Sequence, residues 1–368
     1  MSLALYRKYR PKTLNDLLGQ EQNVTILKNA ARQDKIGHAY LFYGSRGTGK
    51  TTTARLLAKL ANCVKRAEDT KFHDTGEPCN ACVSCIAIDN QHSLDIVEID
   101  AASNRGIDEI RNLKEEVRVA PTGGRHKVYI IDEAHMLTGA AFNALLKTLE
   151  EPPAHAIFIL ATTEFEKLPA TITSRTQRFI FKKLPKVKIL EKLKTIRDAE
   201  KIKIDDAALE LIAAAADGSV RDAESLIDQL SSFGTKIDLA AAERLTGRTA
   251  FKKVDELAHH ILRRELAKCL AFVASLSEEG TNITQFTKDL IHYLRKAIAL
   301  SLNPALADIF SSELTTEEIT RIAVLAKLVD VSRDVALLQS LIRAYSEIRY
   351  SPFASVPLEV TLVENLSK

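Results

Sequence analysis

A chain of 368 residues is long for one hydrophobic core and indicates two or three domains. With 46% hydrophobic and 27% charged residues, the composition is that of an ordinary soluble globular protein. The net charge of +3 is too small to indicate nucleic-acid binding by itself.

No window reaches about 18 uninterrupted apolar residues, so we expect no membrane-spanning helix and no membrane partner. The N-terminal stretch MSLALYRKYRPK lacks the apolar core and small-residue cleavage site of a signal peptide. We therefore expect a cytoplasmic protein. Because thiols stay reduced there, clustered cysteines favour a metal site over a disulfide framework.

Short apolar runs bounded by polar or turn residues predict five buried strands in the first part of the chain, at 39–43, 95–99, 127–132, 156–161 and 178–181. Helical patterns lie between them, such as 50–62 and 139–151, the second of which stops at a pair of prolines. Alternating strands and helices are typical of a parallel, doubly wound α/β sheet.

After residue 181 no further strand is predicted. Three segments have apolar residues at three- and four-residue spacing, which indicates amphipathic helices at 186–201, 205–216 and 220–233. The pattern stays helical to the end, with a long segment at 284–302. We therefore expect an α/β domain at 1–181, a small helical domain at 182–245 and a larger all-α domain at 246–368.

The segment GSRGTGKT fits the P-loop pattern, with a predicted strand before it and a predicted helix after it. Its backbone N–H groups can surround the phosphates of a nucleotide. Lys50 would reach the β- and γ-phosphates, and the Thr51 hydroxyl would bind Mg²⁺. The expected nucleotide-binding residues here are Gly44, Ser45, Arg46, Gly47, Thr48, Gly49, Lys50, Thr51 and Thr52.

A second acidic element follows the predicted strand at 127–132, in the sequence VYIIDEAH. Asp132 ends that strand, where ligands collect in open α/β sheets, and would hold the Mg²⁺ shell. Glu133 is placed to orient or deprotonate the attacking water.

Four longer stretches resemble the gamma/tau family of bacterial DNA polymerase III, the ATPase motors of the clamp loader within the AAA+ superfamily. They are YRKYRPKTLNDLLGQEQ (6–22), HAYLFYGSRGTGKTTTARLLAKLANC (38–63), IDEAHMLTGAAFNALLKTLEEPP (131–153) and ATTEFEKLPATITSRTQRF (161–179). The resemblance is dense over about the first 245 residues and thinner beyond. It implies a P-loop AAA+ domain, then a helical lid domain and an all-α collar that holds the subunits together.

The resemblance also implies roles for single residues. Thr163, with Thr162 as the alternative, corresponds to the polar sensor of the γ-phosphate or water. Arg175 matches the arginine that the family presents to ATP in the neighbouring subunit, so it would act in trans. Arg221 is similar to the lid-domain arginine that contacts the nucleotide of its own subunit.

The N-terminal sequence YRKYRP is similar to the segment that covers the adenine base in this family. Tyr6, Arg7 and Pro11 could pack around a flat base through stacking and a fixed backbone. The alternative is a basic N-terminal arm without a ligand.

Four of the five cysteines lie close together in the sequence, at Cys63, Cys79, Cys82 and Cys85. Four thiolates suit tetrahedral Zn²⁺ in a closed, structural site. The resemblance likewise implies a zinc module inserted after the P-loop helix, at about 63–90. His73 or His92 could replace Cys63 as the fourth ligand; free thiols or a redox pair are the other interpretations.

The function implied by the resemblance is that of an ATP–Mg²⁺-dependent motor that loads a ring-shaped sliding clamp onto primed DNA. The implied partners are delta and delta-prime subunits, further copies of this chain, the clamp and primed-template DNA. A self-contained AAA+ translocase, such as a branch-migration helicase, is the alternative, and a catalytically inactive subunit is a third. Arg105 could contact a DNA phosphate; the alternative is a solvated arginine at the start of a helix.

Overall fold

The computed structural model describes residues 3–104, 106–232, 236–246, 250–311, 314 and 316–367. Their contacts divide the chain into two units: Met1–Leu184 with Asp217–Ser225, and Pro185–Ala216 with Leu226–Lys368. Arg105 lies outside the described residues. In the part of the chain that is described, no helix is both long and apolar enough to cross a membrane.

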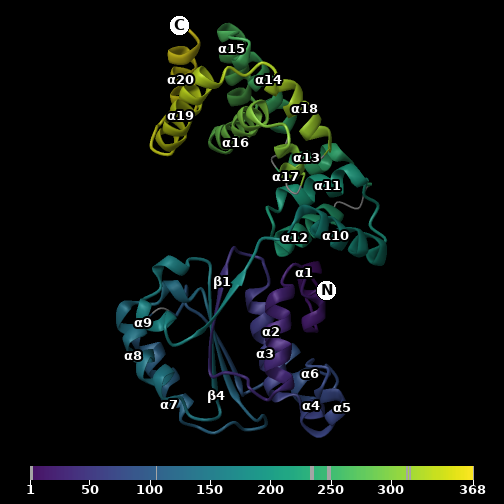
Figure 1. Ribbon diagram of the computed structural model, residues 1–368, viewed down its shortest axis with the longest axis vertical. Helices are drawn as coiled ribbons and strands as arrows, with labels where there is room; N and C mark the ends of the chain where they lie inside the picture. Colours follow the sequence, from purple (N-terminus) through teal and green to yellow (C-terminus); the bar gives the residue numbers. More distant parts are fainter. Residues whose placement is uncertain are drawn as a thin grey trace. The chain divides into compact units, whose positions relative to one another are not determined.

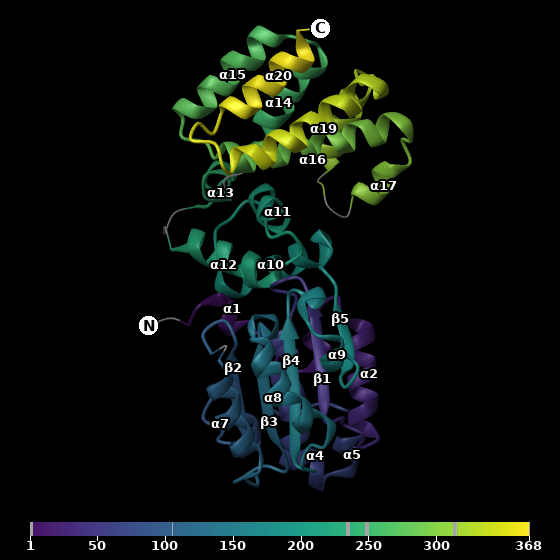
Figure 2. The ribbon, with the colours of Figure 1, turned by 90° about the vertical axis from the view of Figure 1, so that its left-hand side faces the viewer.

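A five-stranded sheet forms the centre of the first unit, in the order β2-β3-β4-β1-β5 (Figure 2). Its paired strands are all parallel. Their bounds are β1 (Ala39–Gly44), β2 (Ile96–Asp100), β3 (Lys127–Asp132), β4 (Ala156–Thr162) and β5 (Gln177–Phe181). Each strand begins and ends within one residue of its predicted range. The predicted parallel α/β sheet is therefore confirmed.

Helices cover both faces of this sheet, with α2 and α3 on one side and α7 and α8 on the other (Figure 1). Successive strand residues face opposite sides. On β1, Tyr40 and Phe42 pack with the cluster that includes α2 and α3, while Leu41 packs with the cluster that includes α7 and α8. A strand buried on both faces must be apolar at every position, which explains the continuous apolar runs in the sequence.

The helices and short 3-10 turns of the first unit connect the strands and build one insertion. They are α1 (Leu5–Lys8), η1 (Leu14–Asp16), α2 (Glu21–Arg32), α3 (Lys50–Asn62), α4 (Val64–Glu68), α5 (Thr70–His73), α6 (Val83–Asp89), α7 (Ile107–Val117), η2 (Ala134–Met136), α8 (Gly139–Glu150), η3 (Phe165–Lys167) and α9 (Ala170–Thr173). The insertion, α4 to α6, lies between α3 and β2 and contains three of the clustered cysteines.

Among its described residues, the second unit is helical, with an isolated bridge between Ile204 and Ile237. Its helices are α10 (Lys186–Glu200), α11 (Asp206–Ala215), α13 (Leu239–Thr246), α14 (Ala250–Leu262), α15 (Leu266–Glu278), α16 (Ile283–Leu302), α17 (Leu306–Phe310), α18 (Thr316–Ala326), α19 (Val331–Ile348) and α20 (Val356–Leu366), with the end of α12 (Val220–Ser231). One apolar core spans α14, α15, α16 and α18 to α20. The helices predicted at 186–201, 205–216 and 284–302 are confirmed.

Asp95 fixes the turn that leads into β3. Its Oδ1 accepts a hydrogen bond from the Thr122 N–H at 2.6 Å, and its Oδ2 accepts bonds from Gly123 at 2.9 Å and Gly124 at 2.5 Å. Burial raises the pKa of this carboxyl, but the three N–H groups together outweigh burial, so the net pKa is lowered. Asp95 therefore stabilises the fold only while it is ionised.

Replacing Asp95 with asparagine should destabilise β2 and β3 by about 1–3 kcal/mol, because the amide group turns a donor toward an N–H donor. Hydrogen exchange at the amides of these strands measures the change. Since the folded pKa lies below the unfolded value of about 3.9, the stabilisation is present above that pH and is lost as the pH falls through the folded pKa. The difference between D95N and the parent should therefore shrink in acid; a constant difference would contradict this account.

Candidate functional site

Three glycines let the P-loop turn sharply between β1 and α3. Gly44, Gly47 and Gly49 have φ values of +141°, +72° and +103°, which side chains rarely adopt. A Cβ at Gly44 would lie 2.1 Å from the Phe181 carbonyl oxygen, and one at Gly47 would lie 1.8 Å from the Ser219 hydroxyl. The loop can therefore take this shape only with glycine at both positions.

The loop ends at the first turn of α3, where Lys50 and Thr51 project toward neighbouring backbone and acidic groups. Lys50 is buried, and its Nζ donates to the carbonyls of Gly44 at 2.8 Å and Ser45 at 2.9 Å. Burial lowers the pKa of Lys50, and the carboxylates of Glu133 and Asp132 oppose that shift. These contacts bring a cation and two carboxylates to one place.

Three other residues predicted to bind the nucleotide lie in this loop or at the start of α3. Thr48 is buried and donates its hydroxyl to the Ser45 carbonyl at 2.8 Å. Arg46 is exposed on the loop, and Thr52 lies in the first turn of α3.

Asp132 ends β3 and Glu133 follows it, at the same sheet edge as the P-loop. The Thr51 hydroxyl donates to Asp132 Oδ2 at 2.7 Å, and the Glu133 N–H donates to Asp132 Oδ1 at 2.9 Å. Glu133 has a φ of +46°, and its Oε2 accepts a bond from the Thr163 hydroxyl at 3.1 Å. The carboxyl ends of parallel strands lie at one edge of a sheet. The loop after β1, the carboxylates at the end of β3 and the threonine after β4 therefore meet there, although they come from three separate chain segments.

The two adjacent threonines at the end of β4 have different partners: Thr162 is the last residue of the strand and Thr163 follows it. Thr163 contacts Glu133, whereas Thr162 is fully buried and its hydroxyl lies 3.0 Å from His135 Nδ1. His135 Nε2 lies 3.2 Å from Glu164 Oε1, so this ring links two carboxylate-bearing segments. Sequence reasoning missed His135, although the DEAH tetrapeptide contains it.

A cluster of cationic and aromatic groups adjoins the loop in the first unit. The Arg221 guanidinium carbon lies 5.2 Å from the Tyr6 ring centroid, and that of Arg7 lies 5.8 Å away. Burial lowers the pKa of Arg10, and the positive charge of Arg55 lowers it further. Sequence reasoning missed Arg10 and Arg55, since nothing in their local sequence separates them from surface arginines.

Pro11 follows this cluster between α1 and η1 and is half-buried. Arg55 is held by Glu98 through two hydrogen bonds of 3.0 and 2.9 Å. Cations that lie close together repel one another, and binding an anion relieves that repulsion. The cluster can thus attract a phosphorylated ligand.

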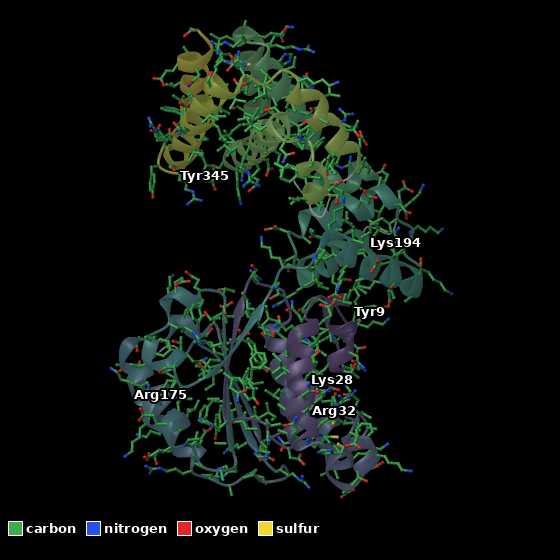
Figure 3. The ribbon with its side chains drawn as sticks, viewed as in Figure 1. Tyr9, Lys28, Arg32, Arg175, Lys194 and Tyr345 are labelled. Carbon is green, nitrogen blue, oxygen red and sulfur yellow. The ribbon has the colours of Figure 1, made fainter. Side chains whose placement is uncertain are left out.

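Arg175 lies far from these groups, beside α8 and α9 (Figure 3). Its Nε donates to Glu150 Oε1 at 2.7 Å, and its Nη1 donates to the Thr171 carbonyl at 2.7 Å. It borders an open hollow of about 460 Å³, also lined by His38 and Ala39. Ala39 begins β1 and the P-loop ends it, so Arg175 lies at the opposite edge of the sheet from its own P-loop.

The four clustered cysteines meet after α3. Their sulfurs all lie within 4.8 Å of one another, with Cys79 and Cys85 at 4.0 Å. Tetrahedral zinc, with Zn–S bonds of about 2.3 Å, requires sulfur separations near these values. The donor set therefore fits Zn²⁺. His73, the alternative ligand, instead lies 3.0 Å from the Asp34 carboxylate.

Hydrogen bonds to sulfur lower the pKa of two of these thiols, Cys63 and Cys82, whereas the pKa of Cys79 is raised by burial and that of Cys85 by its hydrogen bond to Cys63. The Cys85 thiol and the Cys79 N–H, 3.4 Å from the Cys63 sulfur, lower the pKa of Cys63 to about 4 against the effect of burial. The Cys79 sulfur accepts N–H bonds from Ala81 at 3.4 Å and Cys82 at 3.2 Å. Deprotonated thiols are the form that binds metal.

Three family models match successive parts of the chain. They are described as DNA polymerase III, delta subunit (residues 19–185), DNA polymerase III clamp loader subunit, ATPase lid domain (188–236), and DNA polymerase III subunits gamma and tau domain III (237–367). The chain is 40% identical over 362 residues to DNA polymerase III subunit tau of Bacillus subtilis, and 37% identical over 367 residues to that of Escherichia coli. The chain belongs to the gamma/tau family of DNA polymerase III.

The matches extend over 98% and 99% of this chain, but over 62% of the Bacillus subtilis relative and 55% of the Escherichia coli relative. The chain thus spans little more than half the length of these gamma/tau relatives. The family models favour the clamp-loader interpretation over the branch-migration alternative.

Two solved structures are more distant. The Bacillus subtilis clamp loader delta protein (YqeN) has 15% identity and a TM-score of 0.40, covering 94% of this chain and 99% of that one. The Thermotoga maritima RuvB Holliday junction branch migration motor has 21% identity and a TM-score of 0.46, covering 73% and 85%. Similarities of this size carry no argument about this chain.

Proposed function

We propose that this chain is an ATPase motor subunit of a clamp loader, which uses ATP to load a ring-shaped sliding clamp onto primed DNA. The observation that carries the proposal is the division of polar groups between the two edges of one sheet. Lys50, Thr51, Asp132 and Glu133 converge at one edge, while Arg175 lies at the other. A motor whose active sites form between neighbouring subunits needs this division.

In this proposal the P-loop binds ATP, and Lys50 leaves its carbonyl partners for the β- and γ-phosphates. Mg²⁺, when bound, would offset phosphate charge from a position held by Thr51 and Asp132. Glu133 orients and deprotonates the attacking water, and the Thr163 hydroxyl, 3.1 Å from Glu133, senses the γ-phosphate or that water. The contact with Glu133 supports Thr163 over Thr162 for this role.

The N-terminal cluster is proposed to hold the rest of the nucleotide. Tyr6, Arg7 and Pro11 cover the base, while Arg221 contacts the nucleotide of its own subunit. The 5.2 Å approach of Arg221 to the Tyr6 ring supports a shared site for both residues. Arg10 adds positive charge beside them, which favours a phosphorylated ligand.

The proposed partners are delta and delta-prime subunits, further copies of this chain, the sliding clamp and primed-template DNA. Apolar side chains are exposed on α19 at Val331, Val335 and Ile342, and on α20 at Val356, Val360 and Val363. Spacings of four and seven residues on α19, and of four and three residues on α20, put each set on one helix face, and exposed apolar faces suit contacts with other subunits. This supports a collar role for residues 246–368; Figure 3 marks Tyr345 on the same helix, α19.

The three-domain division at 1–181, 182–245 and 246–368 is retained as part of the proposal. The match of the lid model to 188–236 and of the domain III model to 237–367 supports two separate helical parts. The zinc module is proposed at about 63–90, with Cys63, Cys79, Cys82 and Cys85 as the ligands of a structural Zn²⁺.

Removing the metal should loosen this module without unfolding the sheet. A Cys82→Ser variant should lose most of its bound zinc, because one of four ligands is gone, and residues 64–90 should become open to proteases. Zinc content by atomic spectrometry and limited proteolysis measure both effects. Cys269→Ser, whose cysteine lies in the other unit, is the control. Full zinc retention in C82S would contradict the ligand assignment.

The experiment that tests the proposed function is a steady-state ATPase measurement on the chain mixed with candidate clamp-loader partners. We expect a slow rate for the chain alone and strong stimulation when partners, clamp and primed DNA are all present. Fast hydrolysis by the chain alone, indifferent to clamp and primer junctions, would support a self-contained translocase instead.

A further inference from the structure

Glu77 connects the cysteine module to a distant N-terminal segment. This side chain is almost fully buried, with 9% of its surface exposed, and lies two residues before Cys79. Its Oε2 accepts the Leu14 N–H at 2.7 Å, and its Oε1 accepts the Asn15 N–H at 3.1 Å. Lys28 Nζ lies 2.9 Å from Oε1. A single carboxylate thus joins residues more than 60 positions apart.

The N-terminal segment depends on two carboxylates for its backbone. Asp16 accepts the N–H groups of Lys12 at 3.2 Å and Thr13 at 2.9 Å, and Glu77 accepts the next two. These donors precede or begin the short 3-10 turn η1 and have no partner within it. Without Glu77, two buried or half-buried N–H groups would lose their acceptor.

This segment follows the proposed nucleotide-covering residues in the chain and packs near the P-loop in the fold. It directly follows Pro11, and Leu14 is fully buried in the core cluster that also includes Leu17. A Leu17 methyl lies 3.7 Å from the position that a Cβ would take at Gly49 of the P-loop. A shift of residues 12–17 would therefore be transmitted in both directions toward the nucleotide.

The module side of the connection is held by the cysteine cluster and by α3. Lys59 of α3 is buried and donates to Asn80 Oδ1 at 3.0 Å, in the turn between Cys79 and Cys82. Cys63 directly follows α3, so the cysteine cluster and the P-loop lie at opposite ends of one helix.

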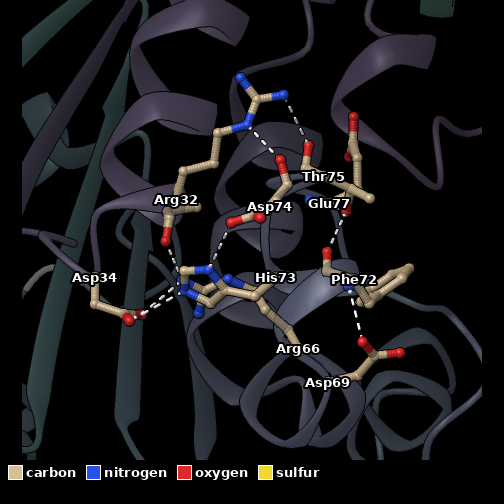
Figure 4. Close-up of polar contacts among 10 residues, drawn as sticks. Arg32, Asp34, Arg66, Asp69, Phe72, His73, Asp74, Thr75 and Glu77 are labelled. Carbon is tan, nitrogen blue, oxygen red and sulfur yellow. Dashed lines mark hydrogen bonds and ion pairs between the residues drawn. The ribbon is translucent and has the colours of Figure 1, made fainter.

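Helix α2 holds the same module from another side (Figure 4). Arg32 Nε donates to the Asp74 carbonyl at 2.7 Å, and its Nη2 donates to the Thr75 carbonyl at 3.3 Å. Arg66 Nη2 and His73 Nε2 lie 2.8 and 3.0 Å from the Asp34 carboxylate, just after the end of α2. Glu77 therefore extends from a well-anchored part of the module.

We propose that Glu77 is a positioning residue for the nucleotide: it holds residues 12–17 so that the zinc module sets how tightly the chain binds ATP. The proposal rests on the proposed function for the location of the nucleotide. Its consequence is that an insertion without chemistry of its own controls the nucleotide site through one carboxylate. Metal loss would release Glu77 and weaken nucleotide binding.

The test compares Glu77→Gln with Glu68→Gln, an exposed glutamate of the same module. We expect E77Q to bind ATP–Mg²⁺ about tenfold more weakly by calorimetry, because the amide cannot accept both N–H groups as a carboxylate does. Amide exchange in residues 12–17 should quicken, while zinc content and exchange in β1 stay as in the parent. In the complex with partners, clamp and primed DNA, the KM for ATP should rise and kcat should change little. E68Q should match the parent in every respect.

Unchanged ATP affinity and unchanged exchange at 12–17 in E77Q, with zinc retained, would overturn the proposal. If E77Q does not fold, the parent chain treated with a chelator provides the second measurement. There the proposal predicts faster exchange at 12–17 and weaker ATP binding, and no change in either would overturn it. Failure of the parent to bind ATP at all would refute the proposed function, whereas the exchange data test the Glu77 connection separately.

Discussion

Glu133→Gln should lower stimulated ATP hydrolysis by about 10²–10⁴-fold while ATP binding stays near the parent value. Glutamine has nearly the same shape and can still accept the hydrogen bond from Thr163, but it cannot take a proton from water. The chain should therefore stop in its ATP-bound state. Single-turnover hydrolysis and equilibrium ATP binding, measured on the same complex, separate the two effects.

Glu166→Gln is the matched control for this variant, since Glu166 is exposed on the short turn η3 after the same sheet edge. It should hydrolyse ATP at the parent rate. A loss in E133Q that matches its loss of ATP affinity would contradict the assignment of a general base. Such a result would leave Glu133 with a purely structural role at the end of β3.

Arg175→Ala should lower stimulated hydrolysis by about 10³-fold or more, with ATP binding unchanged, because a finger arginine stabilises charge that develops only in the transition state. Arg175 lies near Ala39, the first residue of β1, and the P-loop begins at the other end of that strand. The length of the strand, about 20 Å for six residues, therefore separates Arg175 from its own P-loop. Arg175 cannot serve its own nucleotide without refolding. In the proposed role in trans, the side chain would also have to leave Glu150 and the Thr171 carbonyl.

Arg118→Ala, the matched control, removes an exposed arginine at the end of α7, whose guanidinium lies 3.3 Å from the Glu115 carboxylate, and it should leave the rate unchanged. Rates are compared in assembled complexes containing partners, clamp and primed DNA. A small effect of R175A under these conditions, below about threefold, would exclude Arg175 as the finger.

The three central strands, β1, β3 and β4, could be predicted from the sequence because they are buried on both faces, whereas the edge strands β2 and β5 are partly exposed. Tyr129 and Phe158, for example, are fully buried on neighbouring strands, and the residues beside them are apolar. The sharp turn between β1 and α3 could also be predicted, since its glycines and Lys50 form a local sequence motif. In the strand order β2-β3-β4-β1-β5, β3 and β4 lie next to each other and β4 lies next to β1. The ends of β3 and β4 therefore carry Asp132 and Thr163 to the edge where the loop lies.

The contacts that join distant segments could not be predicted in this way. Arg10, which follows α1, and Arg55, on α3, interact only in the folded chain, and Glu77 meets Leu14 across more than 60 residues. No periodicity or local motif encodes such pairs. The location of His135 could have been predicted, because it lies just after two carboxylates in the DEAH sequence at the edge of the sheet.

The central claim is that each active site combines the P-loop of one chain with Arg175 of another. Mixing Lys50→Ala and Arg175→Ala chains in one complex with their partners, clamp and primed DNA tests it most directly. Each variant alone should be nearly inactive, and the mixture should recover a measurable share of parent ATPase activity, because an R175A P-loop can receive Arg175 from a K50A neighbour. A mixture no more active than its components would contradict the claim and place the complete active site within one chain.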